Sequence, residues 1–287
     1  VPEDYRHEEF DDLKIHGFAD LHFKESLYSS DVNLDLFEAK MKVHQLRFED
    51  FRGRIHLEKN DLLIQDFKGR LGKSKFLVNA KLGFGTDTLL KNQKNQFSLE
   101  ASKLDFDELF AYEVSVSEYA SSPEEHEKGF NIYEVPFPNL NVDVDIKDLN
   151  YHLYKIKNFK GKLRIQPNHY IYIDTLSLNT AGGDIRMNGY FNGSNPKLIY
   201  FSPKIKLSEV NLDELLVKFE NFGQDYLVSE NLHGRISGDL WGKIHMHKDM
   251  VPIVDDSEIH LDFNILSGEL ENFGPMEYLS EYFADKN

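Results

Sequence analysis

Apolar and polar residues alternate along most of this chain. In DVNLDLFEAK, which begins at residue 31, Val32, Leu34 and Leu36 fall on one side of an extended backbone, and polar residues fall between them. The segments 141–156 and 257–265 repeat the rhythm. A period of two is typical of β-strands with one dry face and one wet face. The chain is therefore expected to be mainly β.

Turn signals interrupt this alternation about every ten residues. They read EKND at 58–61, QPNH at 166–169, TAGGD at 180–184 and NGSNP at 192–196. Short Gly-, Asn- and Pro-containing turns between such strands favour antiparallel hairpins over βαβ units. We predict an elongated, curved antiparallel sheet, or sheets, built from repeated amphipathic hairpin units with a few short helices.

The chain carries an internal repeat. DFRGRIHL at 50–57 and NFKGKLRI at 158–165 share one pattern, and their glycines, Gly53 and Gly161, lie 108 positions apart. A third, weaker copy includes Gly234. A glycine within a strand marks a bulge or the close approach of another backbone, so we expect all three glycines to serve that purpose.

A second pair of similar segments predicts two short helices. KLDFDELFAY at 103–112 matches EVNLDELLVK at 209–218. Asp105 and Asn211 can serve as N-caps, with Glu108 and Glu214 completing capping boxes. Each helix would close one unit of strands.

These repeats predict four parts. Residues 1–114 form a first β-unit closed by a short helix, and 115–136 form an acidic linker. Residues 137–227 form a second unit closed by a short helix, and 228–287 begin a third, truncated unit.

Charge and composition exclude several functions. The chain has 49 acidic and 33 basic residues and a net charge of −16, which disfavours binding to nucleic acid. It has no cysteine, so thiolate metal sites and disulfides are impossible. Neither an apolar run long enough to span a bilayer nor a signal peptide is visible. Because both ends are abrupt, we expect a fragment of a longer protein.

Three acid or histidine clusters are weighed as metal or catalytic sites and rejected. His245 and His247 share a strand face without a third ligand nearby in the sequence, and the acids at 255–256 fit a turn. Asp31, Asn33 and Asp35 resemble a calcium loop, but Leu36 and Lys42 stand where that loop needs Gly and Glu. Phosphate-binding and nucleophile motifs are also missing. We predict a protein that is not an enzyme and has no cofactor or metal.

Several stretches resemble the C-terminal region of AsmA-like proteins. They are FKGKL at 159–163, LNTAGGDIRMNGYFNG at 178–193, LDELL at 212–216, LHGRISGDLWGKIHM at 232–246 and the tail LDFNILSGELENFGPMEYLSEYF at 261–283. The resemblance covers the chain from about residue 140 onward and, more loosely, residues 31–112. The N-terminal membrane anchor and later strands of that family have no counterpart in these 287 residues.

The resemblance implies a module of a Gram-negative envelope protein, anchored in the inner membrane by a missing N-terminal segment and lying in the periplasm. It implies an apolar β-groove for phospholipid or another acyl lipid, serving outer-membrane biogenesis. The lipid identity, the direction of transfer, the oligomeric state and any protein partners stay open.

The residues expected to line the groove are the apolar alternates of four strands. They are Val32, Leu34, Leu36, Val142, Val144, Ile146, Ile171, Ile173, Leu261, Phe263 and Ile265. The same alternation also fits a closed β-core, as in a ligand-free scaffold or a protein-interaction module of the envelope. An all-β carbohydrate-active hydrolase is a third alternative, which the scattered acids disfavour.

Overall fold

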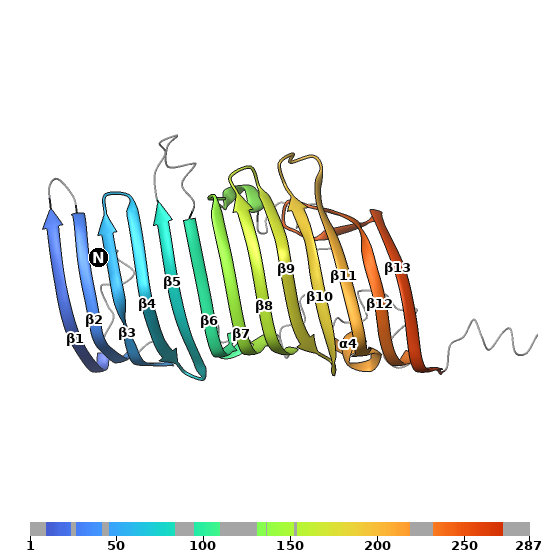
Figure 1. Ribbon diagram of the computed structural model, residues 1–287, viewed down its shortest axis with the longest axis horizontal. Helices are drawn as coiled ribbons and strands as arrows, with labels where there is room; N and C mark the ends of the chain where they lie inside the picture. Colours follow the sequence, from blue (N-terminus) through green and yellow to red (C-terminus); the bar gives the residue numbers. More distant parts are fainter. Residues whose placement is uncertain are drawn as a thin grey trace, which may run out of the picture.

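All the strands that the structure describes join one sheet. The computed structural model describes residues 10–23, 27–41, 46–83, 95–109, 131–135, 137–151, 154–218 and 232–271. Thirteen strands lie side by side in the order of the sequence, with β1 at one end and β13 at the other, in an elongated, curved array (Figure 1). The predicted mainly-β, elongated architecture is confirmed.

The strands are long, and the described helices are few and short. The strands are β1 (Phe10–Phe23), β2 (Leu27–Met41), β3 (Arg47–Glu58), β4 (Asp61–Leu71), β5 (Ser74–Gly83), β6 (Asn95–Asp105), β7 (Leu140–Tyr151), β8 (Tyr154–Gln166), β9 (Tyr170–Thr180), β10 (Gly183–Asn192), β11 (Ile199–Asn211), β12 (Leu232–Met246) and β13 (Pro252–Leu270). The helices are α2 (Phe106–Leu109), α4 (Leu212–Lys218) and the 3-10 helix η2 (Ile132–Glu134).

One neighbouring pair departs from the expected antiparallel pattern. β6 and β7 are parallel, with Phe97 opposite Val142 and Leu99 opposite Val144. All the other pairs in the sheet are antiparallel. A parallel pair needs a crossover longer than a hairpin turn, and here 34 residues, which include α2 and η2, separate the end of β6 from the start of β7 in the sequence.

The tight turns occur where the sequence predicts them. Ala181 and Gly182 join β9 to β10, and both have positive φ, at 48° and 70°. Two consecutive positive φ values are typical of a type I′ turn, whose twist matches that of the flanking strands. Lys59 begins the β3–β4 turn with a φ of 52°, and its amide donates to the carbonyl of Tyr28.

Helices α2 and α4 begin at the predicted N-caps. The Asp105 carboxylate accepts a hydrogen bond from the amide of Glu108 at 3.1 Å, and the Asn211 side chain accepts from the amide of Glu214 at 2.8 Å. The reciprocal half of the first capping box does not form. The Glu108 carboxylate instead accepts from the amide of Lys73 at 2.6 Å, which ties α2 to the β4–β5 turn.

One backbone feature recurs at the 108-residue spacing. Asp50 and Asn158 occupy equivalent positions in β3 and β8, and their φ values are 54° and 50°. The repeated glycines differ, however. Gly53 has a φ of 149°, and a Cβ there would lie 2.6 Å from the Cα of Phe67. A Cβ at Gly161 would meet nothing closer than 3.6 Å, so the predicted backbone requirement holds at Gly53 and not at Gly161.

The described elements form a single layer whose buried clusters lie near the strand ends. One cluster packs α4 residues Leu212 and Leu215 against Val210 and Ile236. A second joins Leu104 and Leu149 beside α2, and a third joins Ile132 of η2 to Phe191 and Ile199. η2 lies at the end of the predicted linker 115–136, and residues 115–130 lie outside the described residues.

Candidate functional site

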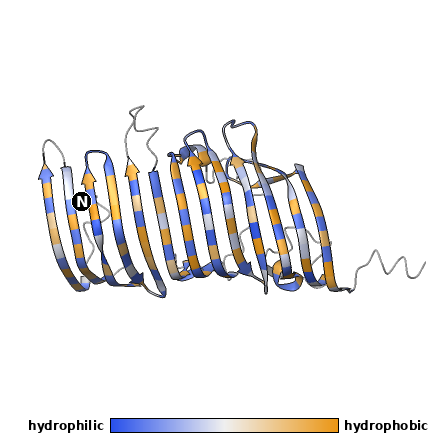
Figure 2. Cartoon of the chain, in the orientation of Figure 1, coloured by the Kyte–Doolittle hydropathy of each residue, from blue (hydrophilic) through white to orange (hydrophobic). Residues whose placement is uncertain are grey.

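One face of the sheet is apolar along its whole length. Directly paired residues define a row that crosses eleven strands without a polar side chain, and we call it the first apolar row. It contains Ala19, Val32, Ile55, Ile64, Ala80, Phe97, Val142, Leu163, Ile173, Gly189 and Pro203. Figure 2 shows the alternation along each strand that puts such residues on one side of the sheet.

Two further rows on this face lie beside the first. The second apolar row contains Gly17, Leu34, Gly53, Phe67, Val78, Leu99, Val144, Gly161, Leu176, Met187, Ile205, Leu240 and Leu261. The third includes Ile15, Phe37, Phe51, Phe76, Ala101, Ile146, Phe159, Leu178, Ile185, Leu207 and Phe263. We call the three rows together the apolar face.

Ten of the eleven predicted groove residues lie on this side of the sheet. Eight of the ten belong to the three rows, and Ile171 lies beside the first row. Ile265 lies opposite Ile236 on β12, two residues beyond Phe263. Leu36 differs, because β2 has an extra residue between Leu34 and Phe37. This bulge pairs Leu36 with His16, and Phe37 takes the place in the third row.

Side chains in the middle of the apolar face are half-buried. Val32, Ile64, Val142, Val144 and Ile173 all keep part of their surface exposed. The main contacts between described elements join neighbouring strands or link the helices to β7, β11 and β12, so no second sheet packs over these rows. The closed two-layer core considered from the sequence is therefore not the architecture of the described residues.

Aromatic side chains concentrate at one end of the apolar face. The ring of Phe51 contacts those of Phe37, Phe48, Phe67 and Phe76, with centroids 5.6–6.2 Å apart. The rings meet mostly edge to face, the geometry that aromatic pairs favour. This cluster fills the β2–β5 end of the face with large aromatic side chains.

The sequence-based choice of groove residues missed most of the apolar face. Phe97, Leu163, Leu176, Met187 and Ile205 lie in the same rows as the chosen residues. Their strands show the same period-two alternation, so that signal was sufficient to find them. What the alternation could not reveal was that the apolar sides of different strands align into common rows.

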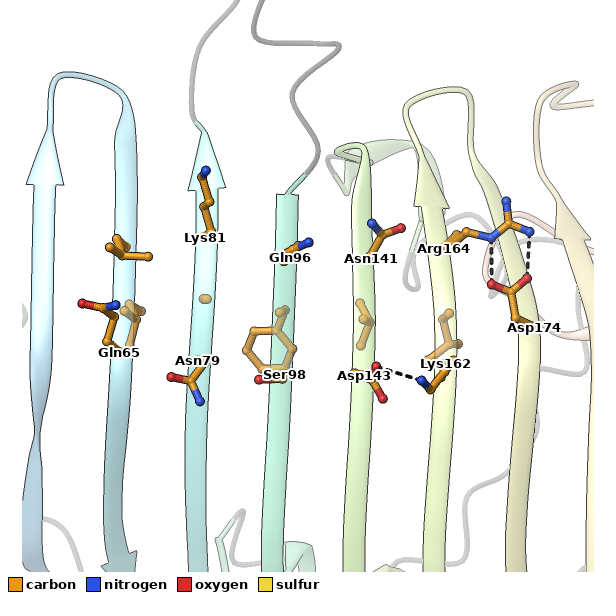
Figure 3. Close-up of a pocket in the computed structure, with 16 residues that line it drawn as sticks. Gln65, Asn79, Lys81, Gln96, Ser98, Asn141, Asp143, Lys162, Arg164 and Asp174 are labelled. Atoms are coloured by element: carbon orange, nitrogen blue, oxygen red, sulfur yellow. Dashed lines mark hydrogen bonds and ion pairs between the residues drawn. The ribbon is translucent and has the colours of Figure 1, made fainter.

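The opposite face is hydrophilic and is held by ion pairs between strands. Lys162 pairs with Asp143 at 3.5 Å, and Arg164 makes two hydrogen bonds to Asp174, at 2.7 and 2.8 Å (Figure 3). These hydrogen bonds lower the pKa of Asp174 and raise that of Arg164. Because both partners are exposed to solvent, such pairs fix the geometry more than they stabilise the fold.

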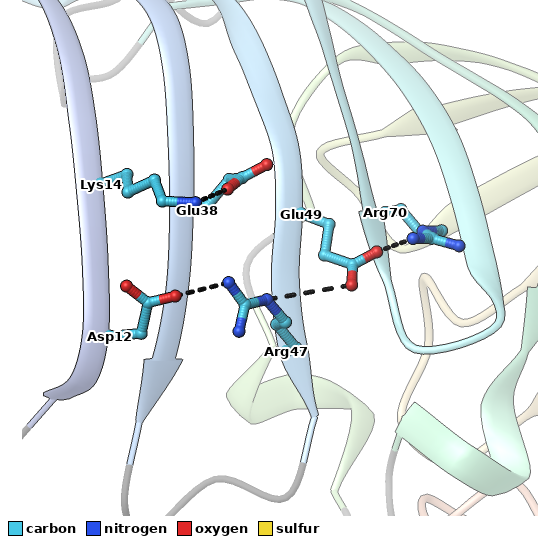
Figure 4. A network of polar contacts seen from close by, with 6 residues as sticks. All are labelled: Asp12, Lys14, Glu38, Arg47, Glu49 and Arg70. Carbon is cyan, nitrogen blue, oxygen red and sulfur yellow. Dashed lines mark hydrogen bonds and ion pairs between the residues drawn. The ribbon is translucent and has the colours of Figure 1, made fainter.

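A second set of ion pairs joins β1 to β4 on the hydrophilic face. Arg47 lies between Asp12, at 2.6 Å, and Glu49, at 3.9 Å, and Glu49 also pairs with Arg70 (Figure 4). With charges on one side and apolar rows on the other, the sheet is amphipathic from its first strand onward.

Among the described parts of the chain, these acids and histidines lie on strands: Asp31, Asn33 and Asp35 on β2, His245 on β12, and Asp255 and Asp256 on β13 instead of in the predicted turn. In these parts of the chain no three His, Asp or Glu side chains gather closely enough to hold a metal ion. The ring of His245 packs against Tyr200 at 6.2 Å, and His56 pairs with Asp31 at 3.0 Å. None of the described helices is long and apolar enough to cross a bilayer.

Comparison with protein-family models, with curated proteins and with solved structures gives no match to this chain. The apolar face is therefore the main structural feature from which a function can be inferred.

Proposed function

We propose that this chain is a non-catalytic lipid-binding module whose apolar face holds the acyl chains of phospholipids. The observation that carries the proposal is the continuous register of apolar residues across the sheet, with side chains left half-exposed. Apolar surface in water is unfavourable, and an exposed patch of this extent indicates a partner or ligand. A run of parallel apolar rows suits long, flexible hydrocarbon chains better than a compact ligand.

The size of the face suits such a ligand. Thirteen strands spaced by about 4.8 Å give an apolar face about 58 Å long across the strands. Each methylene group kept from water contributes about 0.8 kcal/mol, so a tail of about sixteen carbons would gain about 13 kcal/mol on complete burial. Contact with a one-sided sheet gives only part of this value, which favours retention of the lipid while still permitting movement along the row.

The resemblance to AsmA-like proteins supplies the setting of the proposal. In that setting the chain is part of an inner-membrane-anchored periplasmic protein of a Gram-negative bacterium, and it provides part of a path for phospholipid to the outer membrane. The amphipathic, repeated-strand architecture is the feature that supports this assignment.

A single substitution in the middle of the apolar face tests the proposal. Val144→Glu places a carboxylate in the second apolar row between Leu99 and Gly161. Burying that charge against acyl chains costs several kcal/mol, so we expect phospholipid content to fall at least about tenfold. The measurement is mass spectrometry of organic extracts from protein purified out of a bacterial host.

The matched control is Asn141→Glu, which adds the same charge to the same strand on the hydrophilic face. This variant should retain phospholipid near the wild-type level, and circular dichroism should report folded protein for both variants. A wild-type extract without phospholipid contradicts the proposal and favours a scaffold. Equal lipid content in Val144→Glu and wild type contradicts the assignment of the face.

A further inference from the structure

A continuous polar furrow crosses the hydrophilic face, on the side of the sheet opposite the apolar rows. Three hollows form it, with volumes of about 540, 570 and 870 Å³, over β2–β4, β4–β9 and β9–β13. The first and second hollows share Gln65, and the second and third share Asp174. The middle hollow is drawn in Figure 3.

One transverse row of side chains runs along the furrow, with about one residue from each strand. Near one end Asn33 lies opposite Arg54, which lies opposite Gln65. In the middle, the paired residues are Asn79, Ser98, Asp143 and Lys162. At the far end they are Asn188, Lys204, Trp241 and His260. Polar groups therefore repeat every ~4.8 Å, close to the length of one sugar unit in a linear polysaccharide.

The furrow has the opposite charge balance to the whole chain. Nine Lys or Arg residues and six Asp residues line the three hollows, whereas the chain as a whole has 33 basic and 49 acidic residues. Within the described residues, six of the nine bases make no ion pair, and they are Arg54, Lys68, Lys81, Arg186, Lys204 and Lys206. An excess of available cations along a line favours an anionic polymer.

Uncharged hydrogen-bonding groups lie between these bases. Gln96, Ser98 and Asn141 line the middle hollow and make no side-chain hydrogen bond within the described part of the chain. Amide and hydroxyl groups both donate and accept, as recognition of sugar hydroxyls requires. Trp241 lines the third hollow, is 42% exposed, and stacks on His260 at 5.5 Å. An exposed tryptophan provides a platform that one end of such a ligand can contact.

We propose that the furrow binds a linear, acidic polysaccharide lying across the strands. Carboxylates of the polymer would contact the unpaired bases, and its hydroxyl groups would contact the amides. Single-stranded nucleic acid fits less well, because such binding uses repeated aromatic platforms for successive bases. The neighbouring Tyr172 and Tyr190 contact each other, and Arg164 covers the ring of Tyr172, so these rings are already engaged.

The only tryptophan of the chain makes the furrow directly observable. Titrating the purified protein with alginate oligosaccharides, which are linear polyuronates, should change the fluorescence of Trp241 and give a saturable binding curve. Longer oligosaccharides should bind more tightly than tetrasaccharides, since they span more strands. Neutral dextran should bind at least about tenfold more weakly, because it cannot use the cations.

Two double variants with the same loss of charge locate the binding. Lys81→Gln with Lys204→Gln removes two furrow bases and should weaken alginate binding about tenfold. Lys147→Gln with Lys197→Gln removes two bases outside the furrow and should change alginate binding by less than about twofold. Calorimetry gives a second measure of affinity that does not depend on Trp241.

Three outcomes would overturn the proposal. They are no saturable alginate binding, equal weakening by the two double variants, and tighter binding of single-stranded DNA than of alginate. The lipid proposal concerns the apolar face and is tested by phospholipid content. A negative result with alginate therefore does not contradict the lipid proposal, and the absence of phospholipid does not contradict the proposal for the furrow.

Discussion

At the scale of single residues, the two repeated glycines make a matched experiment. Gly53→Ala puts a Cβ 2.6 Å from the Cα of Phe67 at a φ of 149°, so we expect a loss of about 2–3 kcal/mol of unfolding free energy. Gly161→Ala meets only ordinary contacts and should stay within about 0.5 kcal/mol of wild type. Urea denaturation followed by circular dichroism measures both. Equal losses would contradict the different roles assigned to the two positions.

At the scale of elements, the two helix caps are similar in sequence and differ in their surroundings. Asp105 is buried, and besides capping α2 it accepts a hydrogen bond from the Asn150 side chain at 3.0 Å. Asp105→Ala should therefore cost about 2–3 kcal/mol, from the lost cap and the unsatisfied partner. Asn211→Ala should cost about 1 kcal/mol, for the cap of α4 alone. Thermal unfolding compares the two variants, and a larger loss at Asn211 would contradict this ranking.

At the scale of the whole molecule, contacts between the described elements are almost entirely between neighbouring strands. Each inner strand is supported on two sides, whereas β1 and β13 are paired on one side within the described chain. Stability in such an array is close to a sum over neighbouring contacts. We therefore expect amides of β1 and β13 to exchange with solvent faster than those of β6–β8, as measured by hydrogen exchange with mass spectrometry. Uniform protection across the sheet would indicate a fully cooperative unit instead.

The sequence by itself determined which residues form strands and which side of each strand is dry. Alternation about Val142 and Val144, the turn at Ala181–Gly182 and the caps at Asp105 and Asn211 are local features, and each is specified by residues within a few positions. Leu36 does not lie on the predicted face, because the bulge in β2 changes the side to which it points. Such a bulge arises from the pairing of two strands. The alternation of apolar and polar residues within a single strand does not predict such a bulge.

The tertiary structure decided how the strands combine. The alternation of apolar and polar residues predicts that one face of a strand is apolar, but it does not predict what covers that face. An open sheet and a closed core were therefore equally compatible with the sequence. The joining of all thirteen strands in sequence order, the parallel β6–β7 pair and the alignment of the apolar sides into common rows depend on long-range backbone pairing. The polar furrow has the same origin, because its residues come from twelve strands and become neighbours only when those strands lie side by side.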